Sequence, residues 1–496
     1  MKLKKTVAIA ATAGALAAVA MPAMAFENEI HGTSRLRYFI SNYENGGGGN
    51  PLSVNSAGKV PLVSGNATEN QKVNNYFEQR SRLFYTAKAN DDLKLVTAFE
   101  VDSVFGDRAQ SQTTPSATAA GATGRNQGGA MESDTVNLET KWVYLDFKIP
   151  STPINVSAGI QPFKDQLKGI FLDADIAGVV TNTKAGAAAI KAGYLRAYDQ
   201  SFFGTGRPRG MDNLEVGVVE AKFALSKDAS IGAAYYLYND NRGNNIGTMT
   251  TNDIMIHTLG LTGDAKFGAL SLSGFAAYQG GIIKTNTNGS SYLNALAYNV
   301  AAKVPVGPGT FKTAMLFTSG NAQNTGKHLT GWVGMTQAQN NSWATTAGTS
   351  TYNESGMMLL NRNAAAGTGT TDNAIVYNPG NGNNIGNMQG LYLATIGYDA
   401  KITPKLYTNV NVGAAWAAHN NGLKPVDGVK GQNATNYMGT EINLETGYKM
   451  YDNLTASLQA AYVVLGGYYK GSSAVTTAVK DPENPYTIRT SLIYNF

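Results

Sequence analysis

The order of the connecting segments constrains the fold of this chain more than any single motif does. Tight connections such as ANDD, KIPSTP and VPVGPG alternate with long segments rich in Asn, Gly, Thr and Ser along most of the 496 residues. The long segments are expected at 42–74, 106–134, 199–213, 239–252, 280–290, 320–388, 418–436 and 467–485. Between antiparallel strands, this alternation collects the long connections at one end of the sheet. That asymmetry is typical of β-barrels that span a membrane and not of soluble β-sandwiches.

The segments between these connections carry period-2 patterns. In IHGTSRLRYFI, for example, the apolar Leu36 alternates with Arg35 and Arg37. Charged side chains on a strand must reach water, and in a membrane barrel that water lies in the lumen. The pattern predicts an all-β transmembrane antiparallel barrel of eighteen strands, at 29–41, 75–90, 92–105, 135–148, 153–162, 170–182, 188–199, 213–226, 229–239, 253–264, 267–279, 291–304, 309–319, 389–401, 405–417, 437–450, 453–466 and 486–496. The count falls to sixteen if residues 163–199 form a loop folded into the lumen, and a barrel of either size leaves an aqueous channel.

The amino terminus predicts export. MKLKK is cationic, an apolar run follows at 6–20, and Ala23-Met24-Ala25 matches a small-x-small cleavage signal. We therefore expect a cleaved signal peptide at 1–25 and a single barrel domain at 26–496. The apolar run is shorter than the roughly 20 residues of a membrane-spanning helix, and no later segment approaches that length.

The composition argues against several classes of protein. The formal net charge of +5 falls to +2 once Lys2, Lys4 and Lys5 are removed, and there is no basic run, so nucleic acid is not a predicted partner. The chain has no cysteine, which excludes disulfides and thiolate metal sites. Its four histidines lie far apart in sequence, so neither a metal site nor a cofactor is predicted. No G-x-S-x-G or H-E-x-x-H motif is present, and the chain is not predicted to be an enzyme.

The last strand carries a family resemblance. PYTIRTSLIYNF ends on its apolar face with Tyr494 and Phe496. It resembles the carboxy-terminal assembly signal of Gram-negative outer-membrane barrels, and the chain as a whole resembles the porin family. LETKWVYLDFKIPSTPINVSAGIQPFKD is similar to the fourth and fifth strands of porin-like channels, among them those of metal-reducing bacteria. The resemblance implies location in the cell outer membrane, contact with its lipid, and a homotrimer as a common assembly. The metal-reducer resemblance adds exported cytochromes as partners.

Charged residues gather on the water-facing sides of the first strands and the last one. The predicted pore-lining residues are Arg35, Arg37, Arg80, Arg82, Lys88, Lys94, Glu100, Asp102 and Arg489. If the barrel closes, the five arginines form a basic wall whose planar donors suit carboxylate or phosphate groups. A structural interpretation stands beside this one, because Glu78, Glu100 and Asp102 on the same strands can pair with the arginines. The sequence leaves both interpretations open.

A second group of candidates comes from the resemblance alone. In porins the connection after the fifth strand often folds inward and narrows the pore. The matching candidates for a constriction loop are Lys164, Asp165, Lys168, Asp173 and Asp175. An acidic loop opposite a basic wall would set a transverse field that sorts ions. The alternative is an ordinary barrel strand with its charges at the rim. Glu441 and Glu445 are candidates for further negative charge in the lumen.

These patterns predict a porin for the passive diffusion of small hydrophilic solutes and ions. One alternative is a barrel scaffold that supports exported electron-transfer proteins. Another is a substrate-specific channel for an anionic solute. Conduction by the isolated protein separates the channels from the scaffold, and saturable block by one solute separates the two kinds of channel.

Overall fold

The computed structural model describes most of the chain beyond the amino terminus. The described residues are 27–44, 73–106, 138–199, 208–241, 245–246, 249–285, 289–321, 327–336, 352–361, 390–419, 435–470, 473–475, 478–480 and 483–496. The expected signal peptide at 1–25 lies outside them. Within the described part, no helix is long and apolar enough to cross a membrane.

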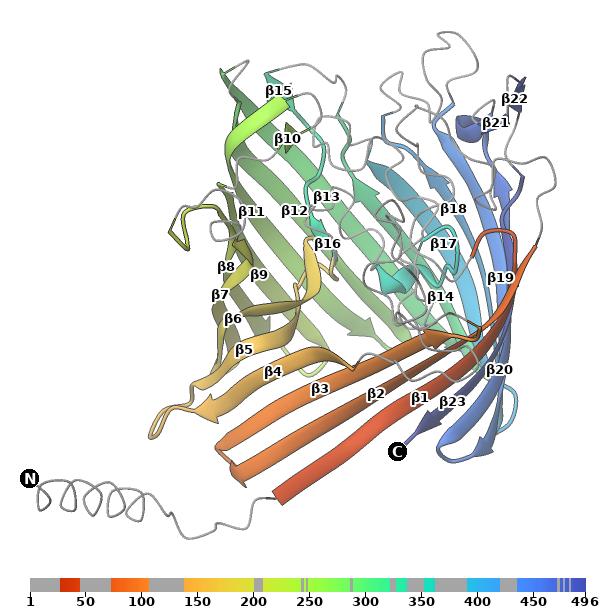
Figure 1. The fold of residues 1–496 in the computed structure, drawn as a ribbon, viewed down its shortest axis with the longest axis horizontal. Coiled ribbons are helices and arrows are strands. Elements are labelled where there is room, and N and C mark those ends of the chain that lie inside the picture. The colour runs from red at the N-terminus through yellow and green to blue at the C-terminus, as the bar shows by residue number, and fades with distance from the viewer. Residues whose placement is uncertain are drawn as a thin grey trace, which may run out of the picture.

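Eighteen antiparallel strands form one closed ring (Figure 1). They are β1 (Glu27–Ser41), β2 (Asn74–Asn90), β3 (Leu93–Val104), β4 (Glu139–Lys148), β5 (Asn155–Lys164), β6 (Leu172–Ala185), β7 (Ala188–Asp199), β8 (Asn213–Ala224), β9 (Ala229–Asp240), β11 (Met249–Phe267), β12 (Leu270–Thr285), β13 (Gly289–Val306), β14 (Gly309–Thr318), β17 (Leu391–Lys401), β18 (Leu406–Trp416), β19 (Tyr437–Tyr451), β20 (Leu454–Leu465) and β23 (Tyr486–Asn495). Each strand pairs with the next one, and β23 pairs with β1. The prediction of eighteen strands is confirmed, because β6 and β7 are wall strands paired on both sides.

Short elements lie between the wall strands. They are β10 (Asn245–Ile246), β15 (His328–Leu329), β16 (Met335–Thr336), β21 (Ser473–Val475), β22 (Ala478–Lys480) and the 3-10 turns η4 (Asn353–Ser355) and η6 (Gly467–Tyr469). Three of them bond to wall strands: β10 pairs antiparallel with β11, β15 pairs in parallel with β13, and β16 pairs in parallel with β6.

The tight connections lie at one end of the barrel and the longer ones at the other, and we call these the turn end and the loop end (Figure 1). The expected long connection at 280–290 is wrong, because β12 and β13 continue through it and leave only 286–288 between them. Gly281 lies inside β12. A Cβ atom added there would lie 2.4 Å from the backbone oxygen of Met255, so this glycine permits close approach of two strands instead of starting a loop.

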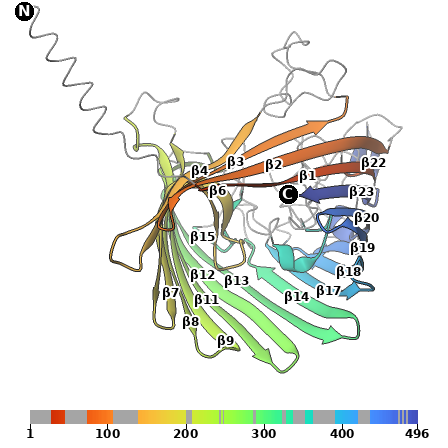
Figure 2. The same cartoon turned by 90° about the horizontal axis from the view of Figure 1, so that it is seen from below.

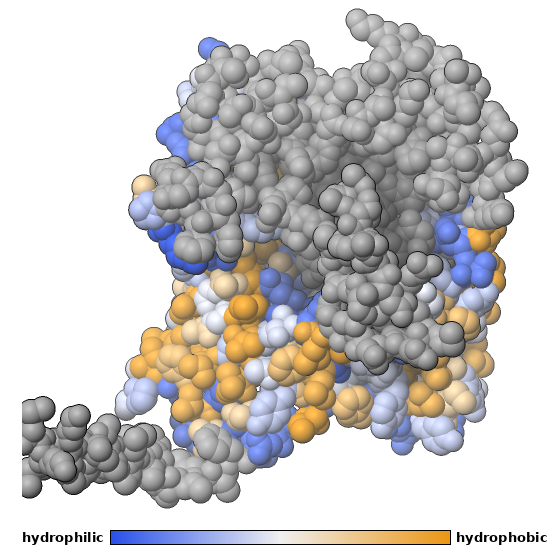
Figure 3. Space-filling view, in the orientation of Figure 1, coloured by the Kyte–Doolittle hydropathy of each residue, from blue (hydrophilic) through white to orange (hydrophobic). Residues whose placement is uncertain are grey.

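The outer face of the barrel is apolar, as a lipid-facing surface requires. Large hydrophobic side chains such as Leu261, Leu296 and Val300 are more than half exposed on it. Hydrophobic residues dominate much of the coloured lower part of the surface, and polar residues gather toward its rim (Figure 3). The seam of the ring explains the aromatic last residue: the backbone N–H of Phe496 donates to Gly32 at 3.0 Å, and Gly32 donates back at 2.8 Å. The terminal strand therefore removes the free edge of the sheet.

Part of the lumen holds a hydrophobic core that the strand pattern did not predict. Three segments, 165–171, 327–336 and 352–361, fold inward and pack against the wall, and we call them the inward segments. The first two bond to each other, since the Trp332 indole N–H donates to the Ile170 carbonyl at 3.2 Å. The region around η4 lies inside the ring of strands in the view from below (Figure 2). The inward segments therefore narrow the lumen on the side of β6 to β19.

Candidate functional site

The five predicted arginines lie on the inner face where the seam is closed, and we call Arg35, Arg37, Arg80, Arg82 and Arg489 the arginine wall. Strand register explains the grouping. Arg35 of β1 faces Arg80 of β2 directly, and Arg489 of β23 faces Phe39 of β1. Directly opposed like charges destabilise a sheet unless acids separate them. The wall therefore needs carboxylates, and neighbouring strands supply them.

Acidic residues pair with the β2 part of the arginine wall. Arg80 binds Asp102 through two hydrogen bonds of 2.6 and 2.5 Å, and it lies 3.6 Å from Glu100. Glu100 also binds Arg82 and lies 3.8 Å from Lys141. Since the side chain of Arg82 keeps 33% of its surface exposed, it is the member of this group that most readily meets a solute.

The β1 and β23 arginines are buried more deeply. Arg35 lies 3.3 Å from Glu78, while Arg37 is 1% exposed and one of its terminal nitrogens has no hydrogen-bond partner. Arg489 is fully buried, and Glu44 binds it through bonds of 2.8 and 2.5 Å. Glu44 could not be predicted as a partner from the strand pattern, because it lies beyond Ser41, the last residue of β1. The structure thus places both expected features, basic side chains and acidic partners, on one wall.

The two lysines expected to extend the wall lie near the turn end. Lys88 and Lys94 are directly opposed on β2 and β3. Lys88 binds Glu29, and the Lys94 ammonium lies 3.5 Å from Asp146. Both lysines are therefore paired with carboxylates, at a distance along the strands from the arginines.

The candidate constriction residues do not gather into one charged loop. Lys164 and Asp173 pair with each other at 2.9 Å across the mouth of the segment 165–171. Asp175 instead joins the network of the arginine wall, because it binds Lys141 at 2.9 Å. Lys168 reaches away from the segment and binds Glu354 of another inward segment at 2.6 Å. The segment does fold inward, but its charges are divided among three separate contacts.

Asp165 is fully enclosed and shapes its own segment. Its carboxylate accepts backbone N–H groups from Gly169 at 2.8 Å, Phe171 at 2.8 Å and Leu172 at 2.5 Å. Burial raises the pKa of Asp165 to about 6, and the three backbone donors oppose that rise. The carboxyl group therefore acts on the conformation of the segment and does not present charge to a passing ion.

Asp165 predicts a pH dependence of stability. Because its pKa is higher in the folded state than in an unfolded chain, the folded state binds the extra proton between about pH 4 and pH 6. This proton stabilises the folded state by about 3 kcal/mol at most, at a pH below the window. The stabilisation is lost as the pH rises from about 4 to about 6, and stability does not change further above that pH because of this group. We expect Asp165→Asn to remove this slope in denaturant titrations at pH 4, 5, 6 and 7. An equal slope in both proteins contradicts the assignment.

A second buried carboxylate anchors another inward segment. Glu441 of β19 accepts backbone N–H groups from Met358 at 2.7 Å, Leu359 at 3.0 Å and Leu360 at 2.5 Å. Glu441 is fully buried, so it supplies a hydrogen-bonding anchor and not the exposed lumen charge considered from the sequence. Glu445, on the same face, accepts the Tyr407 hydroxyl at 2.9 Å.

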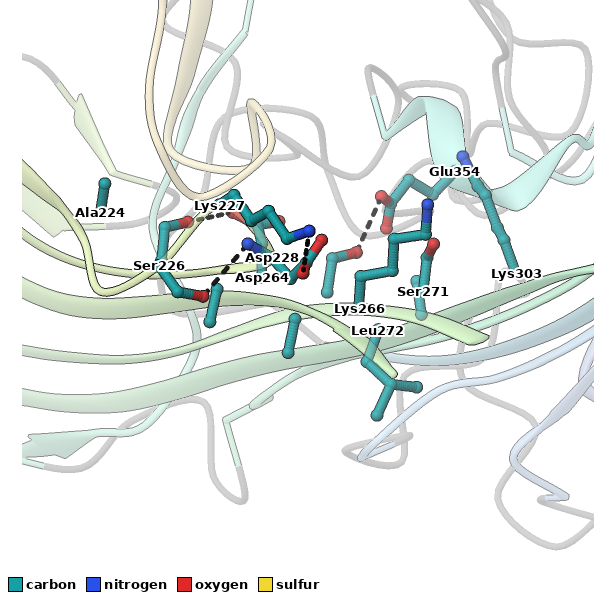
Figure 4. Close-up of a pocket in the computed structure, with 15 residues that line it drawn as sticks. Ala224, Ser226, Lys227, Asp228, Asp264, Lys266, Ser271, Leu272, Lys303 and Glu354 are labelled. Atoms are coloured by element: carbon teal, nitrogen blue, oxygen red, sulfur yellow. Dashed lines mark hydrogen bonds and ion pairs between the residues drawn. The ribbon is translucent and has the colours of Figure 1, made fainter. Parts of the chain in front are cut away.

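A cavity of about 610 Å³ lies at the turn end of the lumen (Figure 4). Its lining includes the β8–β9 turn, the adjoining ends of β11, β12 and β13, and Glu354 of η4. Its charged lining residues are Lys227, Asp228, Asp264, Lys266, Lys303 and Glu354. No strand pattern or motif in the sequence marks these residues as a site. The signal available in the sequence was the polar inner face of β11 at the turn end, where Asp264 and Lys266 follow the apolar Ile254 and Ile256.

The histidines do not form a common site. His31, His257 and His328 each contact a different aromatic ring. No group of three potential metal-ligating side chains occurs among the residues that the structure describes.

The closed ring, apolar exterior and charged interior define the fold of a transmembrane β-barrel with eighteen strands. No family model and no curated protein matches the sequence. Among solved structures, the chain is similar to a BenF-like porin from Pseudomonas fluorescens Pf-5, at 12% identity and a TM-score of 0.50, over 95% of this chain and 98% of that one. It is also similar to Acinetobacter baumannii OccAB4, with 11% identity, a TM-score of 0.49 and coverage of 95% and 98%. The prediction of a porin barrel is thus confirmed at the level of the fold.

Proposed function

We propose that this chain is an outer-membrane channel through which small hydrophilic solutes and ions diffuse passively. The observation that carries the proposal is the opposite character of the two faces of one closed ring. The outer face is apolar, while the inner face holds the arginine wall and the turn-end cavity. A ring of this size encloses an aqueous lumen, and charges on the lumen face tune which ions pass. Similarity to porins of solved structure supports the same proposal through the fold.

Conductance across a planar bilayer tests the channel. We expect the purified protein to give stepwise currents in simple salt, with a reversal potential that shows an ion preference under a salt gradient. A protein that inserts, remains folded and stays silent would overturn the proposal. The rival role as a scaffold for exported electron-transfer proteins would then become the leading hypothesis, and co-purification with exported cytochromes would test it.

The arginine wall predicts how that preference responds to mutation. Arg82→Gln removes the most exposed guanidinium of the β2 group and leaves Glu100 with fewer cationic partners. We expect the anion-to-cation permeability ratio to fall about twofold, since one partly screened charge acts over roughly a Debye length. Lys405→Gln is the matched control, because Lys405 is an exposed lysine in the β17–β18 turn. Equal ratios in wild type and Arg82→Gln would show that this guanidinium lies off the conduction path.

A substrate-specific channel for an anionic solute is the second candidate function. The excess of basic side chains at two places in the lumen favours it over a specific channel for cations. Saturable block of chloride current by one organic anion supports this candidate, and proportional conduction of many solutes supports the general porin. The homotrimer stays a prediction, which cross-linking of the purified protein tests. We propose no catalytic role, and an assay for lipid hydrolysis by the purified barrel tests that statement.

A further inference from the structure

Three lysines and three carboxylates line the turn-end cavity, but two of the carboxylates bind lysines from outside the lining. Lys222 binds Asp264 at 2.8 Å. Lys168 binds Glu354 at 2.6 Å, and both of these pairs border the cavity. Lys227 of the β8–β9 turn lies 4.0 Å from its neighbour Asp228. These three pairs use every carboxylate that lines the cavity.

Two further lysines remain in the lining, Lys266 and Lys303. Among the described residues, neither forms an ion pair with a carboxylate. With Lys168 and Lys222 counted, five lysines and three carboxylates lie in or beside the cavity, and the excess of two positive charges belongs to Lys266 and Lys303.

Strand register brings the two lysines to one place. Lys266 of β11 faces Ser271 of β12, and Ser271 in turn faces Lys303 of β13. The three residues form a row across adjacent strands, so the two lysine backbones are about 10 Å apart. Both side chains extend from the wall on the side where Glu354 lies (Figure 4). Their four-carbon stems are long enough for the ammonium groups to converge on one ligand.

We propose that Lys266 and Lys303 bind a doubly charged oxyanion, of the phosphate type, in the turn-end cavity. The inference rests on the proposed function, because it names the solute class that the lumen retains at its turn end. A dianion neutralises the two unpaired ammonium groups. Ser271 lines the same cavity and adds a hydroxyl donor for the oxygens of the anion, while the Ser273 hydroxyl belongs to the Lys168–Glu354 pair. Ammonium groups act as point charges that suit a tetrahedral oxyanion without requiring a planar partner.

The neighbouring carboxylates do not neutralise Lys266 and Lys303, because each of them is paired with another lysine. Asp264 is held by Lys222 and by the Ser230 hydroxyl at 3.2 Å, so its charge is turned toward β8 and β9. Glu354 is held by Lys168. A ligand that enters between Lys266 and Lys303 therefore meets two cations before it meets an uncompensated anion. Monovalent chloride satisfies only half of that charge, so the site distinguishes phosphate from chloride.

Inorganic phosphate is the probe for the test. In bilayers with dilute chloride, phosphate added at the turn end is expected to reduce the chloride current in a saturable way. The double variant Lys266→Gln/Lys303→Gln is expected to raise the half-blocking phosphate concentration about tenfold, because two charge-assisted contacts are lost. The matched control is Lys401→Gln/Lys405→Gln, which removes two exposed lysines at the same end but outside the cavity lining. Phosphate should block the chloride current of the control variant at the same concentration as that of the wild type.

A binding measurement keeps this inference separate from the channel proposal. Calorimetric titration of phosphate into the detergent-solubilised barrel measures the affinity of the site for phosphate, whether or not the barrel conducts. The site is supported if the wild type binds phosphate, the lysine double variant binds it about tenfold more weakly, and the control variant binds it as the wild type does. This conclusion holds even if no current is found. Equal phosphate binding in all three proteins, or none in the wild type, overturns the site, even if the channel conducts normally.

Discussion

Glu44→Ala is expected to destabilise the barrel by about 3–5 kcal/mol, because it leaves the guanidinium of Arg489 buried without its counter-charge. Arg489 is fully buried, and Glu44 binds it through Nε at 2.8 Å and Nη2 at 2.5 Å. The same carboxylate accepts the Thr487 hydroxyl at 2.5 Å. The removal of Glu44 therefore leaves several donors unsatisfied at once. Equilibrium unfolding in denaturant, followed by the mobility shift between folded and unfolded barrel, gives the free energy.

The design includes a rescue and a matched control. Glu44→Met/Arg489→Met removes both charges and is expected to recover most of the lost stability, since a buried ion pair often exchanges with apolar residues at little cost. Glu29→Ala breaks the exposed pair with Lys88 and should leave stability unchanged. A single Glu44→Ala variant as stable as the wild type, or a double variant no better than the single, contradicts the role assigned to the pair.

Glu441→Ala is expected to release the inward segment 352–361 from the wall and to enlarge the channel. The substitution leaves the backbone N–H groups of Met358, Leu359 and Leu360 without their acceptor. Each buried, unsatisfied donor costs about 1–3 kcal/mol, so the loss of the acceptor for three donors makes the bound position of the segment less favourable by roughly 3–9 kcal/mol. We expect a higher single-channel conductance and faster proteolysis within the segment.

The control for this effect lies on the same strand. Glu445→Ala removes a carboxylate that faces the same way but binds Tyr407 and not the inward segment. It should leave both readouts as in the wild type. Glu441→Gln keeps one acceptor oxygen and should give an intermediate result. If Glu441→Ala conducts and resists proteolysis like the wild type, then other contacts hold the segment and the carboxylate is not its anchor.

The wall of the barrel was largely predictable, because period-2 alternation is a local property of each strand. The eighteen strands and the ends at which they connect follow from that pattern. The grouping of the arginines also follows, since closure makes β23 a neighbour of β1. The strand register was not predictable to the residue, and it decides which acid meets which base. Arg80 meets Asp102 and Arg82 meets Glu100 only in the observed register.

The inward segments could not be predicted from local sequence patterns. Residues 327–336 and 352–361 fall inside one long connection, and their packing depends on contacts with distant strands. One indirect signal existed: near the loop end, strands such as β11 carry apolar residues on both faces, including Ile254 and Ile256 on the inside. An inner face in contact with water would not need them. The roles of Asp165 and Glu441 were also hidden, because sequence shows a carboxylate but not the backbone donors around it.

The seam between β1 and β23 has a consequence for biogenesis. Ser41 donates to the carbonyl of Tyr486, a contact that spans 445 residues of chain, and Glu44 meets Arg489 across the same separation. Contacts this remote in sequence form late, because the intervening chain must first be brought together. Until β23 arrives, the growing sheet exposes two unpaired edges that invite aggregation. Closure of the ring therefore depends on the last strand to be synthesised. A chain truncated before Tyr486 lacks that strand and keeps both edges of the sheet unpaired.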